Sequence, residues 1–463
     1  MYRKKVFKSV IYFLVLIFCF ALFTEVKAQP KKINDKAKKV AAVGDQYFRK
    51  KDYRNAVNKY AEAIAIASNY PYAHFWKGYA HYYLEEFDLA IDDLDKALAQ
   101  GHPPLEIYKL RWFLNYNKKN YDAALNDVQK GLQLDPSNSN MSLGLGDIYH
   151  AKGNYRESID AYKKAFQLDP NNGDAHYFMA VNYSKLGDSE QQGLFALEAV
   201  KKGTKYVGES YYLAGDSFQK AGNLNEAIMQ FKRAINVNPK TENVYARLSE
   251  MYRTQNRLDD ATATTKKGLI EYPNDGDLYA NLSWHYSLAN RNVETIDNAK
   301  KAIEILPDNF LAHINLCRAY SETMQYPQAL KICTDTLKIN PDDGEANYYL
   351  ARAYDFTGKK NESAPFYKKA AEGLVKTTDK NPENANNFYL LGGSYFVLGQ
   401  FDNAIEAYKK SVQLNPKFTK AIFNLGVAYS LTNNKDAANE QYKLLLELDK
   451  ALAEKLKQTI AQK

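Results

Sequence analysis

The chain has 463 residues, of which 45% are hydrophobic and 25% charged, and it contains 37 Tyr, 23 Gly, 14 Pro and three Cys. These proportions belong to a chain that buries a core, and they argue against extensive disorder, a fibrous protein and a disulfide-dense scaffold. The formal net charge is +8, and much of it lies at the N-terminus.

Residues 1–28 have the pattern of a secretory signal peptide. Four basic residues precede an apolar run from Ile11 to Phe23, which is shorter than the roughly 20 residues that a membrane-spanning helix needs. Small side chains then lead to an expected cleavage between Ala28 and Gln29. An uncleaved signal anchor is the alternative. Cys19 lacks the surrounding small residues of a lipoprotein site, so we do not expect lipidation.

Cleavage would remove five basic residues and one acidic residue, and would lower the net charge from +8 to +4. A nucleic-acid-binding protein is expected to carry a large basic face, and none is visible beyond a small cluster over residues 31–39. No later segment approaches the run of about 18 apolar residues typical of a membrane span, so we expect no transmembrane segment after cleavage. Residues 29–36 are interpreted as a short lead.

Prolines in the rest of the chain recur with a regular spacing. They are Pro136, Pro170, Pro239, Pro273, Pro307, Pro341, Pro382 and Pro416. Because proline has no N–H group and biases the preceding residue away from the helical region, each one indicates the end of a helix. Apart from two longer intervals, successive prolines lie about 34 residues apart, and such a period is typical of a repeat array.

The prolines define twelve units, which begin at residues 37, 71, 105, 139, 173, 208, 242, 276, 310, 344, 385 and 419. Units 1–10 cover residues 37–377, residues 378–384 form an insertion, and units 11 and 12 cover residues 385–452. Apolar spacing predicts two amphipathic helices with a short turn in every unit, and no strand pattern occurs. The frame is least regular in the units at 173–206 and 242–275.

Two further helical features are expected near the C-terminus. Good helix formers continue from Ala370 to Asp379, so the second helix of unit 344–377 should extend into the insertion. Residues 453–463 should complete a capping helix, since Leu452, Leu456 and Ile460 recur on one face among polar residues.

The repeated positions resemble the tetratricopeptide repeat (TPR) family. Its pattern is present as Leu391, Gly392, Tyr395, Ala404, Tyr408 and Pro416, and again as Gly215, Ala227, Phe231, Ala234 and Pro239. The resemblance covers nearly all of the chain after the signal peptide. It implies an all-α, right-handed superhelix, or α-solenoid, of about twelve helix-turn-helix units, in an exported bacterial TPR protein.

The eighth and twenty-fourth places of a unit should face each other across its two helices. A small residue at one place usually accompanies a large one at the other, as in Gly146 with Tyr162, which conserves volume in a packed core. In unit 310–343 these places hold Cys317 and Cys333. They could form a disulfide if their Cα atoms lie about 4.4–6.8 Å apart, or could fill the contact as two buried thiols.

The resemblance also implies that the second, fifth, ninth and twelfth places of each unit face a concave groove. Residues at or beside these places form the expected partner-binding set: Tyr72, Phe75, Tyr79, Tyr82, Tyr83, Phe113, Tyr116, Arg318, Arg352, Tyr389 and Phe396. Ordinary packing between repeats is the alternative for the aromatic members. The family's clamp for chaperone tails uses Lys and Asn at places that hold Ala41 and Asp45 here, so that specificity is not expected.

Catalytic and metal-binding signals are missing from the sequence. The repeats leave no room for a catalytic domain, the seven His residues form no HExxH motif, and neither a G-x-S-x-G nor a phosphate-binding loop occurs. We therefore expect no enzymatic activity, no metal and no cofactor.

The sequence predicts a non-enzymatic protein–protein interaction scaffold of the bacterial cell envelope, with a protein or peptide partner in the groove. A periplasmic location is expected, with a secreted or surface-associated protein as the alternative. An accessory role in secretion or outer-membrane assembly follows from the resemblance. The alternative function is a glycan- or peptidoglycan-associated binding protein that uses the aromatic groove. The sequence leaves the partner and the oligomeric state open.

Overall fold

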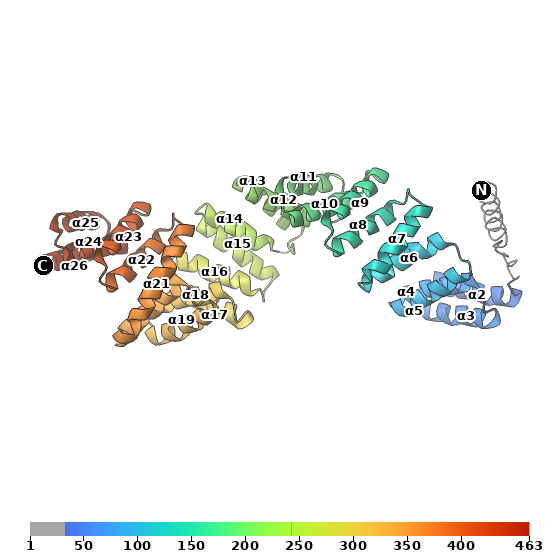
Figure 1. Ribbon diagram of the computed structural model, residues 1–463, viewed down its shortest axis with the longest axis horizontal. Coiled ribbons are helices and arrows are strands. Elements are labelled where there is room, and N and C mark those ends of the chain that lie inside the picture. Colours follow the sequence, from blue (N-terminus) through green and yellow to red (C-terminus); the bar gives the residue numbers. More distant parts are fainter. Residues whose placement is uncertain (1–32, 242, 463) are drawn as a thin grey trace, which may run out of the picture. The chain divides into compact units, whose positions relative to one another are not determined.

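The computed structural model describes residues 33–241 and 243–462, which form 25 helices, α2 to α26, and no strand (Figure 1). The expected signal peptide, its cleavage point and the first half of the lead lie outside the described residues. Along the chain the helices alternate as first and second helices of successive repeats and end with one last helix, so the expected all-α repeat architecture is confirmed. Within the described ranges, no helix combines the length and apolarity needed to cross a membrane.

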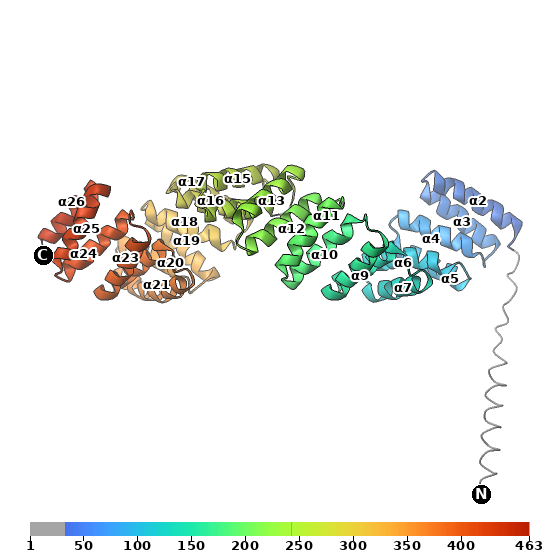
Figure 2. The same ribbon diagram turned by 90° about the horizontal axis from the view of Figure 1, so that it is seen from above.

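The described helices fall into two compact units, which divide between Gly187 and Asp188. The first unit contains α2 (Asp35–Arg49), α3 (Tyr53–Ile66), α4 (Pro71–Tyr83), α5 (Phe87–Ala99), α6 (Pro104–Asn117), α7 (Tyr121–Leu134), α8 (Ser139–Ala151), α9 (Tyr155–Leu168) and α10 (Gly173–Leu186). Within the unit, consecutive helices lie side by side (Figures 1 and 2).

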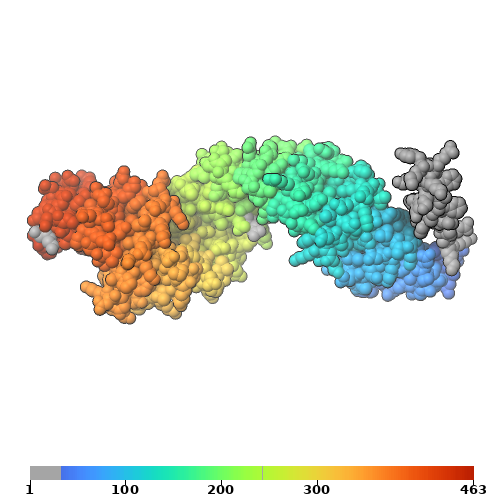
Figure 3. All heavy atoms as spheres, viewed as in Figure 1, coloured from blue at the N-terminus to red at the C-terminus, as the bar shows by residue number. Residues whose placement is uncertain are grey.

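The second unit begins with α11 (Ser189–Lys201), α12 (Val207–Lys220), α13 (Leu224–Val237), α14 (Val244–Thr254), α15 (Leu258–Glu271), α16 (Gly276–Leu288), α17 (Asn292–Ile305), α18 (Phe310–Glu322) and α19 (Tyr326–Ile339). It continues with α20 (Gly344–Phe356), α21 (Lys360–Lys380), α22 (Ala385–Val397), α23 (Phe401–Leu414), α24 (Thr419–Leu431), α25 (Lys435–Leu448) and α26 (Lys450–Ala461). Neighbouring helix pairs of this unit form a continuous surface (Figure 3).

The first helix of a repeat commonly begins at an Asn or Asp cap. The side chains of Asn138, Asn172, Asp275, Asn309, Asp343 and Asn384 each accept a hydrogen bond from a backbone N–H of the helix that follows. Such caps satisfy N–H groups that have no partner inside the helix. The cap residue therefore fixes where the first helix starts.

The first helix ends just before the fifteenth place of the repeat, where the backbone has positive φ in all twelve repeats. The residues are Lys51, Glu85, Lys119, Gly153, Gly187, Gly222, Asn256, Asn290, Met324, Gly358, Gly399 and Asn433. A left-handed residue stops a helix and turns the chain toward the next one. Fewer than half of these residues are glycine, so the repeat imposes this conformation on other residue types as well.

The expected contact between the eighth and twenty-fourth places is confirmed. A Cβ atom added to Gly146 would lie 2.5 Å from the ring of Tyr162, and one added to Gly392 would lie 2.6 Å from the ring of Tyr408. Both tyrosines are almost fully buried. The excess of tyrosine is therefore used in part to fill the core against glycine.

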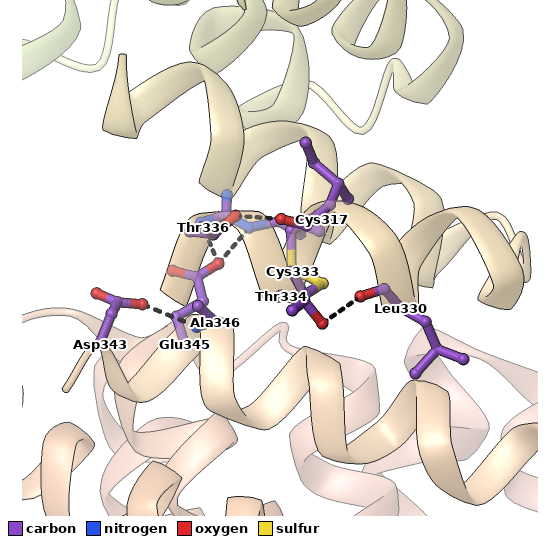
Figure 4. The surroundings of a disulfide bond; sticks show 10 residues. Cys317, Leu330, Cys333, Thr334, Thr336, Asp343, Glu345 and Ala346 are labelled. Atoms are coloured by element: carbon purple, nitrogen blue, oxygen red, sulfur yellow. Dashed lines mark hydrogen bonds and ion pairs between the residues drawn. A yellow bond between two sulfur atoms is a disulfide. The ribbon is translucent and has the colours of Figure 1, made fainter. Parts of the chain in front are cut away.

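Cys317 of α18 and Cys333 of α19 occupy the same two places, and their sulfur atoms are bonded in the structure (Figure 4). The Cα atoms are 5.0 Å apart, within the range that a disulfide requires. Both residues are fully buried. The bond joins the two helices of a single repeat.

The predicted extension of the second helix in unit 344–377 is confirmed, because α21 has 21 residues while the second helices before and after it have 14. α21 passes close to the start of α20. Each helix carries a glycine at this point, Gly373 in α21 and Gly344 in α20. A Cβ on Gly373 would lie 2.6 Å from the Asp342 carbonyl oxygen and 2.8 Å from the Cα of Gly344. The close crossing therefore requires glycine.

The last helix closes the array as expected. Leu456 of α26 is fully buried beside Ile422 and Leu445, and Leu452 and Ile460 pack at the edge of this cluster. The polar residues of α26 face outward, which suits a helix that ends a stack of repeats.

The second unit also contains a repeated contact between a lysine on a second helix and a tyrosine on the next first helix. The pairs are Lys232 with Tyr252, Lys266 with Tyr286, and Lys300 with Tyr320, at 5.6, 5.5 and 5.8 Å from Nζ to the ring centroid. Such cation–π contacts contribute about 0.5–1 kcal/mol at exposed sites. They recur in three consecutive repeats and join each of these to the repeat that follows.

Candidate functional site: a groove pocket in the second unit

A pocket of about 470 Å³ lies on the first helices of three consecutive repeats, α12, α14 and α16. Most of its lining residues occupy the groove places expected from the repeat frame. They include Tyr212, Ala246, Glu250, Arg253, Asp277 and Trp284. This volume is in the usual range for a ligand-binding cleft.

The local start of α14 differs from that of the other first helices. α14 begins at Val244, the third place of its repeat, and has only 11 residues. The cap residue is Asn243, which has a left-handed backbone and makes no side-chain capping bond, while the hydroxyl of Thr241 donates to the Asn238 carbonyl instead. Asn243, at the N-terminal end of this short helix, lines the pocket.

The two acidic residues of the pocket have partners within the chain. Glu250 accepts from Nη1 of Arg247 at 3.3 Å, and Asp277 accepts from the side-chain amide of Asn309 at 2.7 Å. Burial alone would lower the pKa of Arg247, but the Tyr212 hydroxyl and the Glu250 carboxylate hold that pKa above its ordinary value. The charges of Arg247 and Glu250 thus offset each other.

Arg253 has a different environment. Its guanidinium carbon lies 3.9 Å from the centroid of the Trp284 ring, and it makes no ion pair or side-chain hydrogen bond with any residue that the structure describes. Burial lowers the pKa of Arg253, and the negative charge of Glu250 offsets this only in part. The pocket therefore holds a partly desolvated cation without an anionic partner.

His285 lies beside this cation and is almost completely buried. Burial, together with the positive charge of Arg253, lowers the pKa of His285 to about 4. The imidazole is therefore neutral at pH 7, and its Nδ1 lies 3.5 Å from the hydroxyl of Thr265. Among the described lining residues, the one cation that is not neutralised is Arg253.

The aromatic residues expected in the groove of the first unit form a network of ring contacts. Tyr79 contacts Tyr82 and Tyr83 at centroid distances of 5.9 and 5.4 Å, and Tyr82 contacts Phe113 at 6.0 Å. The exposed members are Tyr72, Tyr83 and Phe113, with 37%, 46% and 38% of their surface accessible. Tyr79 and Tyr82 are half-buried. The network therefore combines inter-helix packing with an exposed edge.

The interpretation of Phe75 as a groove residue is wrong. Phe75 is buried, and its ring stacks on His102 at 4.2 Å. The turn between α5 and α6 covers this side chain, so it belongs to the core between repeats. Tyr116 is half-buried and contacts Trp112 and Tyr121.

The two arginines expected in the groove of the second unit are bound by acidic residues of the chain. Arg318 pairs with Glu345 at 2.5 Å, and Arg352 pairs with Glu322 at 3.2 Å. Burial would lower the pKa of each arginine, but Glu345 holds the pKa of Arg318 above its ordinary value, and Tyr348 and Glu322 do the same for Arg352. Neither arginine offers an unpaired charge to a partner.

The remaining members of the expected set pack against aromatic neighbours. Tyr389 lies 4.9 Å from Phe418, and Phe396 lies 5.6 Å from Phe401 in an edge-to-face arrangement. They are only partly buried. No group of three or more His, Cys, Asp or Glu residues that could hold a metal ion occurs in the described part of the chain.

The groove pocket was not predicted from the sequence, although a signal for it is present there. The ninth place of unit 276 is Trp284, one of only three tryptophans in the chain, and the twelfth place of unit 242 is Arg253. Following the groove places through the irregular unit 242–275 would have placed these two residues on adjacent repeats.

Family models confirm the repeat assignment. A TPR repeat model matches residues 44–85, 146–187 and 392–433, a tetratricopeptide repeat model matches residues 208–241 and 419–452, and the model of anaphase-promoting complex, cyclosome, subunit 3 matches residues 322–411. The chain belongs to the tetratricopeptide repeat superfamily, and it is an all-α repeat solenoid. No curated protein sequence matches the chain.

Several solved structures resemble the chain at low identity. The Cut9–Hcn1 hetero-tetramer of APC/C matches at 13% identity over 91% of this chain and 95% of that chain, with a TM-score of 0.42. A tetratricopeptide repeat protein from Parabacteroides merdae matches at 16% identity over 55% and 98%, with a TM-score of 0.39. YrrB, described as a TPR protein with an unusual peptide-binding site, matches at 18% identity over 40% and 95%, with a TM-score of 0.35.

Proposed function

We propose that the chain is a non-enzymatic interaction scaffold that binds a segment of a protein partner in the groove pocket of α12, α14 and α16. The observation that carries this proposal is the meeting of groove places from three consecutive repeats around one cavity. Repeat solenoids use extended concave surfaces for binding. The pocket adds an aromatic ring and several polar groups, which are the usual means of orienting a bound segment.

We further propose that the protein acts in a bacterial cell envelope, in the periplasm, as an accessory factor for secretion or outer-membrane assembly. Two features support export. Residues 1–28 have the pattern of a signal peptide. The disulfide between Cys317 and Cys333 is a bond typical of oxidising compartments and rare in the cytosol.

Site-specific photocrosslinking in cells tests the binding proposal. A photoreactive amino acid at Ala246, which lines the pocket, should give a discrete adduct with one partner protein. The matched control is the same amino acid at Ile270 on α15, which is 76% exposed and does not line the pocket. An adduct of equal yield from both positions, or none from position 246, would argue against a partner in this pocket.

A second candidate function is binding to glycan or peptidoglycan through the first unit. The exposed rings of Tyr72, Tyr83 and Phe113 favour it, since flat aromatic faces suit stacking on sugars. Sedimentation with purified peptidoglycan tests this candidate. Retention that is lost in the Tyr83→Ala and Phe113→Ala double variant would support it, and an unretained wild-type protein would reject it.

A further inference from the structure

We infer that the groove pocket recognises an acidic side chain of the partner segment, and that Arg253 binds its carboxylate. This inference rests on the proposed function and names the chemistry of the ligand.

The first argument is a comparison among arginines. Five arginines are partly buried in the described part of the chain: Arg111, Arg247, Arg253, Arg318 and Arg352. Four of them have a carboxylate within ion-pair distance, with partners Asp127, Glu250, Glu345 and Glu322 respectively. Arg253 alone among the five has none. A desolvated cation normally requires such a partner, so the missing anion is expected from the ligand.

The second argument is the geometry of the cation. The guanidinium carbon of Arg253 lies over the ring of Trp284, 3.9 Å from its centroid, and an arginine over an aromatic ring can stack through the flat face of its guanidinium. The N–H donors lie in the plane of the guanidinium and keep their capacity to bind a carboxylate with two hydrogen bonds. Since His285 is neutral beside it, no second positive charge competes for the ligand.

The charge balance of the lining favours a single carboxylate over a polyanion. Arg247 and Glu250 are paired with each other, and Asp277 adds a second negative charge to the lining. A nucleic acid or a polyphosphate would meet these two carboxylates at close range. One aspartate or glutamate side chain of the partner matches the single unpaired cation.

The remaining polar groups of the lining suit a peptide backbone. The side-chain amides of Asn243 and Asn281 both line the pocket, and neither makes a side-chain hydrogen bond with another described residue. An amide group can donate to a peptide carbonyl and accept from a peptide N–H. An extended acidic segment of a protein therefore fits both the charge and the hydrogen-bonding groups of the pocket.

The probe is a phage-displayed library of linear dodecapeptides selected against residues 29–463. Selected peptides should carry an Asp or Glu in common, and the affinity measured by fluorescence anisotropy should fall about tenfold to a hundredfold in the Arg253→Gln variant. The matched control is Arg233→Gln, which removes an exposed arginine that lies over Tyr211 at 5.8 Å and should leave binding unchanged. Replacing the shared acidic residue of the peptide by its amide tests the same contact with the wild-type protein, without relying on the folding of a variant.

A further variant, Ala246→Trp, separates this inference from the proposed function, because the larger side chain fills the pocket. In one outcome Ala246→Trp abolishes binding, Arg253→Gln binds as tightly as the wild-type protein, and the amide peptide binds as tightly as the acidic peptide. The pocket then binds peptides, but the inferred preference for an acidic side chain is wrong. If no peptide is selected, or if Ala246→Trp has no effect, both the inference and the peptide-binding pocket are wrong.

Discussion

At the scale of single residues, the left-handed backbone conformation at the fifteenth place of the repeat is imposed by the fold and not by the type of side chain. Met324 has φ of 60° and 72% of its surface exposed, so it gains little from packing to offset its left-handed backbone. Glycine occupies the same place at Gly222 and Gly358. The repeat therefore contains positions where the native residue is not the most stable one.

Replacing Met324 by glycine should stabilise the protein by about 0.5–1 kcal/mol, because the left-handed conformation costs a residue with a Cβ about 1–2 kcal/mol and glycine recovers most of it after its own entropic cost. Urea unfolding of residues 29–463 is the measurement. The converse change, Gly222→Ala, should destabilise the protein at the same place of another repeat. A loss of stability in Met324→Gly would contradict this account.

The buried His285 should make stability depend on pH. Its folded-state pKa of about 4 lies below the unfolded value of about 6.5, so the unfolded chain binds the proton first. The contribution of neutral His285 to the free energy of unfolding should be fully present above about pH 6.5. It should be lost as the pH drops toward 4, by up to about 3 kcal/mol. The His285→Gln variant should lack this part of the pH dependence when both proteins are unfolded in urea at pH 7, 5.5 and 4.5. If the free energy of unfolding depends on pH in the same way for the wild-type protein and for His285→Gln, His285 is not the group responsible.

At the scale of helices, α21 shows how an insertion is accommodated in a repeat array. The additional residues extend a helix that the fold already contains, and the repeat that follows begins again with a capped helix at Asn384. The extension is possible because Gly344 and Gly373 let the helices α20 and α21 cross closely. A one-atom change at this crossing is therefore a sensitive test of the packing.

The Gly373→Ala variant should lose about 1–3 kcal/mol of stability, although alanine is normally favoured over glycine inside a helix by about 1 kcal/mol. The added methyl group meets backbone atoms of Asp342 and Gly344, which cannot move aside as a flexible side chain can. Thermal unfolding is the measurement, and the exposed neighbour Glu372→Ala is the control, with an expected change within about 0.5 kcal/mol. A stabilised Gly373→Ala variant would show that the crossing is loose.

At the scale of the whole molecule, most of the architecture could be predicted from the sequence because it repeats. The proline period, the facing eighth and twenty-fourth places and the extended α21 all follow from local patterns that recur or break visibly. The candidate site could not be predicted in this way. Most of the pocket lining comes from α14 and its cap residue Asn243, which lie in an irregular repeat. Phe75 was misplaced because the turn that ends its own repeat, with His102, covers it.

The proposed export leads to a prediction about the covalent state of the protein. The protein purified from its own envelope should begin at Gln29, and it should have no alkylatable thiol before reduction, because Cys317 and Cys333 are bonded. Intact mass measurement with and without reduction checks both statements at once. A mass that includes residues 1–28 would indicate an uncleaved anchor, and two alkylated cysteines would contradict an oxidised pair.

One ion pair of the second unit has a mechanical consequence. Lys420 of α24 and Glu322 of α18 lie 2.7 Å apart although they are far apart in the sequence, while most contacts of a solenoid join only adjacent repeats. This pair links the first and the fourth of four consecutive repeats, so it should resist extension of this part of the solenoid. Because Lys420 is about half exposed, salt screens the pair. The segment from α18 to α24 should therefore be stiffer at low ionic strength and more extensible at high ionic strength.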